Sequence, residues 1–259
     1  MRRTTGIRIS TLTTSLSSRT AGRIGQFTAR KNGLSASEQV RRISVVRQTE
    51  FSFGKMSVKI LHQVWVQGES ELPEDFRRRR KVWEKTLPEG WEMILWDGEM
   101  AKKQWSDYAE VESLCSHHAM RADLILARCL RDFGGLVTGT DVEPNKPEGL
   151  LTFIENFPTM VLVDPHEPQV SNGLVWSEEP KHPFIECVCR HQLRDKRILK
   201  DRNVSKITGP ECWWDALKAK KWDLCLATTT HAYTSQWRKG YPMNHNAWVD
   251  PCYASSWNP

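Results

Sequence analysis

The sequence predicts an α/β domain with a mostly parallel sheet covered by helices on both faces. Segments with the composition of buried strands alternate with helical segments along residues 58–228. This alternation is typical of sheets whose parallel strands are joined through helices. The length of 259 residues is also sufficient for one such domain with a substantial core and an additional tail.

Six segments are expected to be strands. The first, residues 58–66, is almost continuously apolar, as expected for a strand buried on both faces. The others are short and rich in β-favouring residues, at 91–96, 136–137, 159–163, 169–177 and 224–228. The 91–96 strand is followed by Asp97 and Gly98, which we expect to form a turn, and the 224–228 strand is expected to be the last.

Four helices are expected between these strands. Residues 73–86, 183–194 and 210–218 are three of them, and Pro210 suits the first turn of its helix. The charge cluster at 77–81 is expected to be a solvated face. The fourth helix precedes the strand at 136–137 and ends at Gly134 and Gly135, which can adopt the left-handed conformation. Its apolar residues recur at three- and four-residue steps: Ala119, Ala122, Leu126, Cys129, Leu130 and Phe133.

The first 55 residues differ in composition from the rest of the chain. They carry eleven Lys or Arg against two Glu, a net charge of +9, whereas the remaining residues carry 26 basic and 29 acidic side chains, a net charge of −3. We expect residues 1–55 to be a disordered basic leader and 56–259 to form the domain. The leader fits an organellar transit peptide, a basic arm attracted to nucleic acid or anionic membrane, or an upstream extension before Met56 without function.

Other features of the composition favour a reduced, cytoplasmic-type compartment, with an organelle as the alternative if the leader is a transit peptide. The seven cysteines are odd in number and scattered, so they predict no disulfide framework. Cys187 and Cys189 are one residue apart, which is not a zinc-ligand spacing. No run of about 18 apolar residues occurs, so we expect neither secretion nor a membrane span.

A candidate binding site follows the strand at 136–137. In open α/β sheets, ligands bind beyond the carboxyl ends of the strands, which is where residues 138–141 fall. Asp141 offers a carboxylate of the kind that Mg²⁺ or Mn²⁺ prefers. The same aspartate, followed by Val142, Glu143 and Pro144, is also compatible with a simple turn after a strand.

Seven sequence segments extend this observation over residues 59–237. They are KILHQVWVQG, WEMILWD, RAD, the GG pair with its acidic strand end, SNGLVWSEEPKHPF, ITGPECWWDAL and HAYTSQW. In this order they resemble the glycosyltransferases that carry a sugar-binding region with a DXD motif, a family of yeast-type mannosyltransferases, bacterial capsule enzymes and, distantly, large clostridial glucosylating toxins. The chain departs from the family twice, with Gly139 at the first aspartate of the motif and Leu126 where an arginine is usual.

The resemblance implies a GT-A-like fold and transfer of a sugar from a nucleoside-diphosphate sugar to an acceptor, with retention of anomeric configuration. It implies Mn²⁺ or Mg²⁺ bound by Asp141, because the leaving diphosphate needs a compensating positive charge. The residues implied in the site are Asp123 at the ribose or base, Trp65 beside the nucleotide, Arg121, Thr140 and Asn172 around the nucleotide sugar, and His231, Ser235 and Trp237 in a loop over the diphosphate.

Alternatives remain open for these residues and for the whole chain. Asp123 is also compatible with a capping role or with a salt bridge along its helix to Arg128 or Arg121, and Asn172 with an ordinary turn. Trp65 is compatible with core packing, and His62 with an inner histidine whose hydrogen bonds are satisfied. The chain itself is also compatible with a catalytically inactive nucleotide-sugar or carbohydrate-binding relative. A third alternative is a protein associated with nucleic acid through its basic leader.

Overall fold

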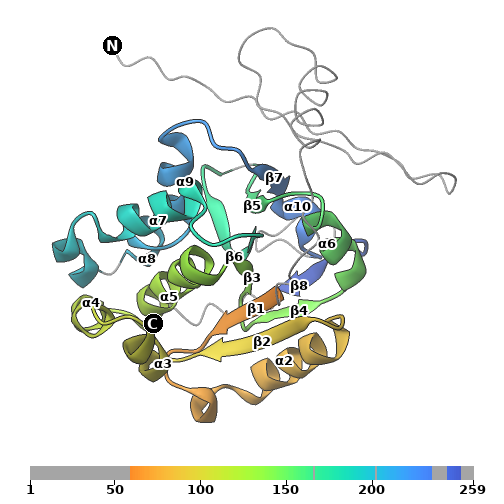
Figure 1. The fold of residues 1–259 in the computed structure, drawn as a ribbon, viewed down its shortest axis with the longest axis horizontal. Helices are drawn as coiled ribbons and strands as arrows, with labels where there is room; N and C mark the ends of the chain where they lie inside the picture. Colours follow the sequence, from red (N-terminus) through yellow and green to blue (C-terminus); the bar gives the residue numbers. More distant parts are fainter. Residues whose placement is uncertain (1–58, 166, 202, 235–243, 252–259) are drawn as a thin grey trace, which may run out of the picture. The chain divides into compact units, whose positions relative to one another are not determined.

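A computed structural model describes residues 59–165, 167–201, 203–234 and 244–251, and the statements below concern these residues. They form a mixed α/β domain around a six-stranded sheet (Figure 1). The strands of this sheet are β1 (Lys59–Val64), β2 (Trp91–Trp96), β3 (Gly135–Thr138), β5 (Thr159–Val163), β6 (Val170–Ser177) and β7 (Cys225–Thr228).

The strand order is β2-β1-β3-β6-β5-β7, and every strand except β6 runs in the same direction. The prediction of a mostly parallel sheet is therefore confirmed. β6 runs antiparallel because only a short connection joins it to β5, and a parallel neighbour would need a longer crossover. Thr138, the last residue of β3, lies opposite Leu174, so the first residues of β6 extend past the end of β3.

A second, two-stranded sheet pairs β4 (Val142–Pro144) with β8 (Val249–Pro251) in antiparallel fashion. The alternative of a turn after the strand holds for Thr140 and Asp141 alone, because the chain re-enters a strand at Val142. The expectation that 224–228 is the last strand was wrong, since β8 follows it.

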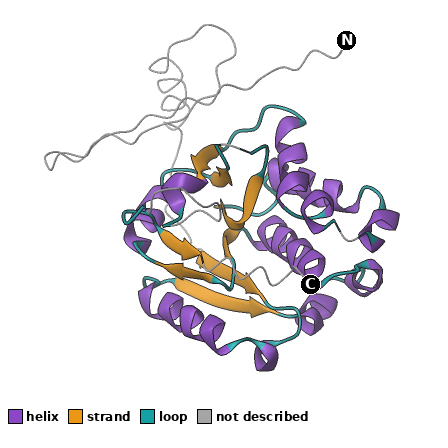
Figure 2. Cartoon of the chain, turned by 180° about the vertical axis from the view of Figure 1, so that it is seen from behind, coloured by secondary structure: helices purple, strands orange, loops and turns teal. Residues whose placement is uncertain are grey.

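Helices cover both faces of the larger sheet, as the sequence predicts; Figure 2 shows the strands between them from behind. Alternate strand residues pack in opposite directions: Val137 contributes to the core beneath α5, α7 and α9, and Leu136 to the core beneath α2 and α6. The helices are α2 (Glu74–Thr86), α3 (Gly98–Gln104), α4 (Tyr108–Leu114), α5 (His118–Phe133), α6 (Pro147–Ile154), α7 (Pro183–Leu193), α8 (Val204–Ile207), α9 (Pro210–Lys218) and α10 (Thr229–Ala232), with 3-10 turns η1 (Glu69–Glu71) and η2 (Lys196–Lys200).

Helix α5 follows the predicted pattern closely. It starts at His117, whose ring nitrogen accepts a hydrogen bond from the backbone N–H of Ala119 at 3.2 Å. It ends at Gly134, with φ of 69°, and Gly135 follows with φ of 90°. Gly135 also lies so close to β1 that a Cβ there would overlap the carbonyl oxygen of Ile60. The glycine pair therefore ends the helix and allows β3 to pair with β1.

Asp97 starts a helix, and the expected turn at Asp97 and Gly98 was wrong. Its carboxylate accepts a hydrogen bond from the backbone N–H of Met100 at 2.7 Å, which makes Asp97 the N-cap of α3.

His62 is a satisfied inner histidine. It is fully buried, its Nδ1 accepts from the indole N–H of Trp96 at 3.0 Å, and its Nε2 donates to the carbonyl of Gly134 at 3.0 Å. Burial lowers the pKa of His62 to about 4, so the ring is neutral. These bonds connect β1, β2 and the end of α5, which is a structural role.

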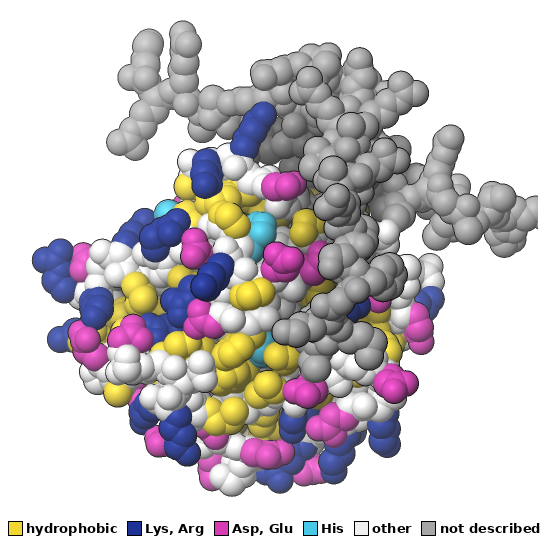
Figure 3. Space-filling model, in the orientation of Figure 1, with side chains coloured by type: hydrophobic (Ala, Val, Ile, Leu, Met, Phe, Trp, Pro, Cys, Tyr) yellow, Lys and Arg dark blue, Asp and Glu magenta, His cyan; other side chains and the backbone are white. Residues whose placement is uncertain are grey.

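Several charged residues of the domain form ion pairs. Arg79 of α2 bonds Asp75 at 3.1 Å and Glu143 at 3.5 Å, and Arg128 of α5 makes a two-pronged ion pair with Asp107 at 2.8 Å. Basic and acidic side chains are interspersed on the face shown in Figure 3, in line with the nearly balanced charge of residues 56–259.

The six described cysteines are free thiols. None of the helices described here is long and apolar enough to cross a membrane.

The role of Gly135 predicts a strong effect of adding one methyl group. Gly135→Ala should lower the free energy of unfolding by at least about 2 kcal/mol, because backbone strain at positive φ adds to overlap with the backbone of β1. Gly90→Ala is the matched control, since Gly90 has φ of 85° and open space around it, so strain alone should cost about 1 kcal/mol. Urea unfolding measures both values, and equal losses would refute the close-approach argument.

Candidate active site

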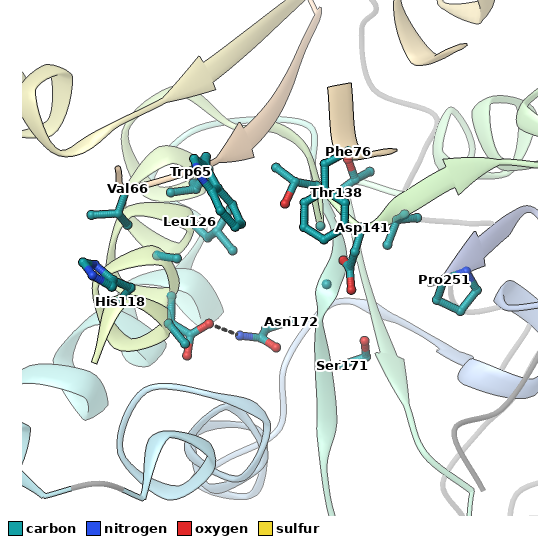
Figure 4. Close-up of a pocket in the computed structure, with 18 of the residues that line it drawn as sticks. Trp65, Val66, Phe76, His118, Leu126, Thr138, Asp141, Ser171, Asn172 and Pro251 are labelled. Carbon is teal, nitrogen blue, oxygen red and sulfur yellow. Dashed lines mark hydrogen bonds between the residues drawn. The ribbon is translucent and has the colours of Figure 1, made fainter. Parts of the chain in front are cut away.

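A cavity of about 310 Å³ lies at the carboxyl ends of β1 and β3, bordered by the start of β6 and the first turns of α5 (Figure 4). This is the edge of the sheet where the sequence predicts binding. The cavity brings together five side chains that the sequence singles out: Trp65, Asp123, Thr140, Asp141 and Asn172.

The end of β3 is held by hydrogen bonds from two neighbouring strands. The amide of Gln63, on β1, donates to the hydroxyl of Thr138 at 3.1 Å and to the carbonyl of Gly139 at 3.2 Å. From β6, the carbonyl of Gly173 accepts from the N–H of Gly139 at 3.0 Å. The chain then turns tightly, with Val142 N–H bonded to Gly139 at 3.2 Å, so Asp141 lies in the turn and lines the cavity.

Asp123 reaches the cavity from α5 and is hydrogen-bonded through both carboxylate oxygens. Oδ1 accepts from the side-chain amide of Asn172 at 2.7 Å, the bond drawn in Figure 4, and Oδ2 accepts from the hydroxyl of Thr208 at 2.9 Å. Gln192 supports Thr208 by donating to its carbonyl at 2.8 Å. The alternative of a salt bridge to Arg121 or Arg128 was wrong, since Asp123 fixes Asn172 instead.

This environment changes the acidity of Asp123. Desolvation raises the pKa of its carboxyl to about 7, although the hydrogen bonds from Thr208 and Asn172 oppose the shift by favouring the charged form. The carboxyl therefore titrates near neutral pH while it holds Asn172.

Trp65 forms an aromatic wall together with Phe76. The rings meet edge to face, with centroids 5.6 Å apart and an interplanar angle of 87°. Trp65 is half-buried and lines the cavity, so it both packs against Phe76 and is available to a ligand. Its indole N–H is buried and has no hydrogen-bond partner among the described residues.

Ser171 and Tyr233 are cavity residues that sequence reasoning missed. Their hydroxyl oxygens are 2.7 Å apart, and burial together with the charge of Asp141 raises the pKa of Tyr233, so the phenol stays protonated. Both belong to quoted segments, SNGLVWSEEPKHPF and HAYTSQW. The antiparallel direction of β6, which brings Ser171 to the strand ends, is the signal that was lacking.

Two other predicted residues, His231 and Arg121, lie outside the cavity lining. His231 packs edge-on against Trp248, with ring centroids 4.9 Å apart, and it does not line the cavity. Arg121 donates to the carbonyl of Cys115 at 3.2 Å and also lies outside the lining. Ser235 and Trp237 fall outside the described residues. The roles expected for these four residues stay predictions.

The cavity wall contains little positive charge. Leu126 lines the cavity where an arginine was expected from the resemblance, and no Lys or Arg is among the described lining residues. In the same described part of the chain, no group of three or more His, Cys, Asp or Glu side chains is arranged to hold a metal ion. Asp123 and Asp141 are the two carboxylates among the described lining residues, and that of Asp123 already binds Asn172 and Thr208.

Comparisons with known proteins give distant similarities. No family model matches the chain. It is 22% identical over 167 residues to a protein of Acanthamoeba polyphaga mimivirus named "Uncharacterized glycosyltransferase L373", a match that covers 62% of this chain and 65% of that protein, slightly less than two thirds of its length. Among solved structures it is similar to one titled "PaToxG Glycosyltransferase", with a TM-score of 0.47 and 14% identity over 61% of this chain and 68% of the other.

The raised pKa of Asp123 predicts a measurable dependence of stability on pH. An unfolded aspartate ionises near pH 3.8, whereas folded Asp123 keeps its proton until about pH 7, so the wild type loses stability as pH rises through this window. Asp123→Asn lacks this loss. Its free energy of unfolding relative to wild type should therefore rise by about 3 kcal/mol between pH 4.5 and 7.5.

Denaturant unfolding at several pH values measures the difference, with Glu148→Gln on the exposed face of α6 as the control. His62 is common to all three proteins, so its own titration cancels in the comparison. A difference between wild type and Asp123→Asn that does not change with pH would contradict the raised pKa.

Proposed function

We propose that this protein is a glycosyltransferase that transfers a sugar from a nucleoside-diphosphate sugar to an acceptor, assisted by a divalent cation and with retention of anomeric configuration. The observation that carries the proposal is the meeting of Trp65, Asp123, Asn172 and Asp141 in one cavity at the strand ends. The sequence similarity to the mimivirus protein named an uncharacterized glycosyltransferase supports the same class. Retention of configuration follows from the family resemblance alone.

The cavity suits a small polar ligand with an aromatic part. Its volume of about 310 Å³ lies at the lower end of the range for small-molecule sites. Trp65 offers an apolar ring for a base or ribose. Asn172 uses its amide N–H₂ on Asp123, so its side-chain oxygen, on the side of Ser171 in Figure 4, is positioned to accept from a sugar hydroxyl.

The residues present fit a hard divalent cation with a single protein carboxylate. Mg²⁺ commonly takes one or two carboxylates and completes its coordination with phosphate and water oxygens, and Mn²⁺ shares the preference for oxygen. Asp141 would hold such a cation at the cavity edge. When bound, the cation supplies positive charge to the leaving diphosphate, which no Lys or Arg among the described lining residues supplies.

The cavity residues have separate tasks in the proposed transfer. The bond between the anomeric carbon and the diphosphate oxygen breaks, a bond from the anomeric carbon to the acceptor oxygen forms, and the proton of the acceptor hydroxyl passes to the departing diphosphate. Asp123 acts as a positioning residue for Asn172, because its Oδ1 accepts from the Asn172 amide while its Oδ2 is held by Thr208. This role adds to the direct contact with ribose or base that the resemblance implies for Asp123, which lines the cavity.

A catalytically inactive nucleotide-sugar-binding relative is the second candidate. Gly139 in place of an aspartate and Leu126 in place of an arginine favour it, since each removes a charged group that the related enzymes use. The two candidates differ in turnover and agree on ligand binding.

Replacing Asp141 tests the transferase against the inactive relative. Asp141→Asn should lower Mn²⁺-dependent hydrolysis of the donor by at least about 100-fold, because the isosteric amide has no charge with which to hold the cation. Release of nucleoside diphosphate from a panel of uridine- and guanosine-diphosphate sugars, with and without Mn²⁺, is followed by mass spectrometry.

Glu148→Gln serves as the control for loss of a surface carboxylate and should hydrolyse the donor at the wild-type rate. Donor binding without turnover by the wild type would favour the inactive relative. If the wild type neither binds nor turns over any donor, both candidates are overturned.

A further inference from the structure

We propose that Gly139 is a positioning residue for the carboxylate of Asp141, because only a residue without a side chain at 139 leaves room for that carboxylate where it lies. The inference rests on the proposed function, in which Asp141 holds the cation. A Cβ at position 139 would be 2.5 Å from Oδ1 of Asp141 and 3.2 Å from Cγ2 of Val142. The first separation is shorter than a carbon and an oxygen can approach without bonding.

The backbone conformation does not require glycine at this position. Four of the described glycines have positive φ, at 68, 90, 134 and 135, and Gly139 is not among them. An alanine at 139 could therefore adopt the same backbone. What it could not do is coexist with the present position of the Asp141 carboxylate.

The surroundings determine which group would move. The backbone of Gly139 is held by Gly173 at 3.0 Å, by Gln63 at 3.2 Å and by Val142 at 3.2 Å. The conflicting atom on the other side is the end of a flexible side chain. A methyl group at 139 would therefore displace the carboxylate of Asp141 and leave the strand end in place.

This arrangement changes the meaning of the missing first aspartate of the motif. If Gly139 marked only the loss of a metal ligand, any other small residue at this position would leave cation binding unchanged. In the structure, the space next to the Cα of residue 139 is occupied by the carboxylate of Asp141, which faces the cavity in Figure 4. The glycine therefore permits a site built on one carboxylate.

The test compares Gly139→Ala with Gly173→Ala in the full chain. Gly173 also lines the cavity and lacks positive φ, but a Cβ there would have only ordinary contacts, 3.6 Å from Tyr233 Oη and 3.8 Å from Ser171 Oγ. Mn²⁺ binding is titrated by electron paramagnetic resonance in the presence of UDP and, in parallel, of GDP. Melting temperatures report on folding.

Gly139→Ala should weaken Mn²⁺ binding at least about ten-fold, which corresponds to about 1.4 kcal/mol, with a melting temperature within about 2 °C of wild type. Gly173→Ala should weaken it less than about three-fold. Wild-type affinity in Gly139→Ala, equal losses in both variants, or unfolding of Gly139→Ala would each overturn the inference.

The Asp141→Asn variant distinguishes failure of the inference about Gly139 from failure of the proposed function. If Asp141→Asn binds Mn²⁺ as tightly as wild type, or wild type binds none with either nucleotide, the cation role of Asp141 is overturned and the inference falls with it. If Asp141→Asn loses the cation and Gly139→Ala keeps it, only the role of Gly139 is overturned.

Discussion

The site depends on the hydrogen bonds that fix the end of β3 between β1 and β6. Gln63 reaches across from β1 to Thr138 and Gly139, and Gly173 pairs with Gly139 from β6. Because β6 is antiparallel and Leu174 lies opposite Thr138, the first residues of β6 extend past the end of β3, which brings Ser171 and Asn172 to the same cavity as Asp141. With a parallel strand at this position, the opposite end of the strand would lie there.

A second set of contacts ties the cavity to the helices on one face of the sheet. Asp123 of α5 binds Asn172 of β6 and Thr208, which follows α8, and Gln192 of α7 completes the set. The partial burial of a carboxylate is unfavourable, as its raised pKa indicates. The arrangement orders one amide at the cavity edge, which is consistent with a site that discriminates among hydroxyl groups of a ligand.

Much of the domain could be predicted from sequence because its strands and long helices carry clear local patterns. The periodicity of α5, its end at Gly134 and the position of Asp141 after β3 all follow from residue type and spacing. The direction of β6 and the pairing of β4 with β8 depend on long-range contacts, so local patterns did not reveal them. Helices α3, α4 and α6 are short, and their start signals, such as Asp97, are also typical of turns.

The most direct test of the central claim is a crystal structure of the protein soaked with Mn²⁺ and UDP or GDP, with the anomalous signal of manganese used to locate the ion. The account predicts an anomalous peak about 2.2 Å from a carboxylate oxygen of Asp141 and from a diphosphate oxygen, with the base beside Trp65. A nucleotide bound in the cavity without manganese at Asp141, or a cavity that takes up neither, would contradict it.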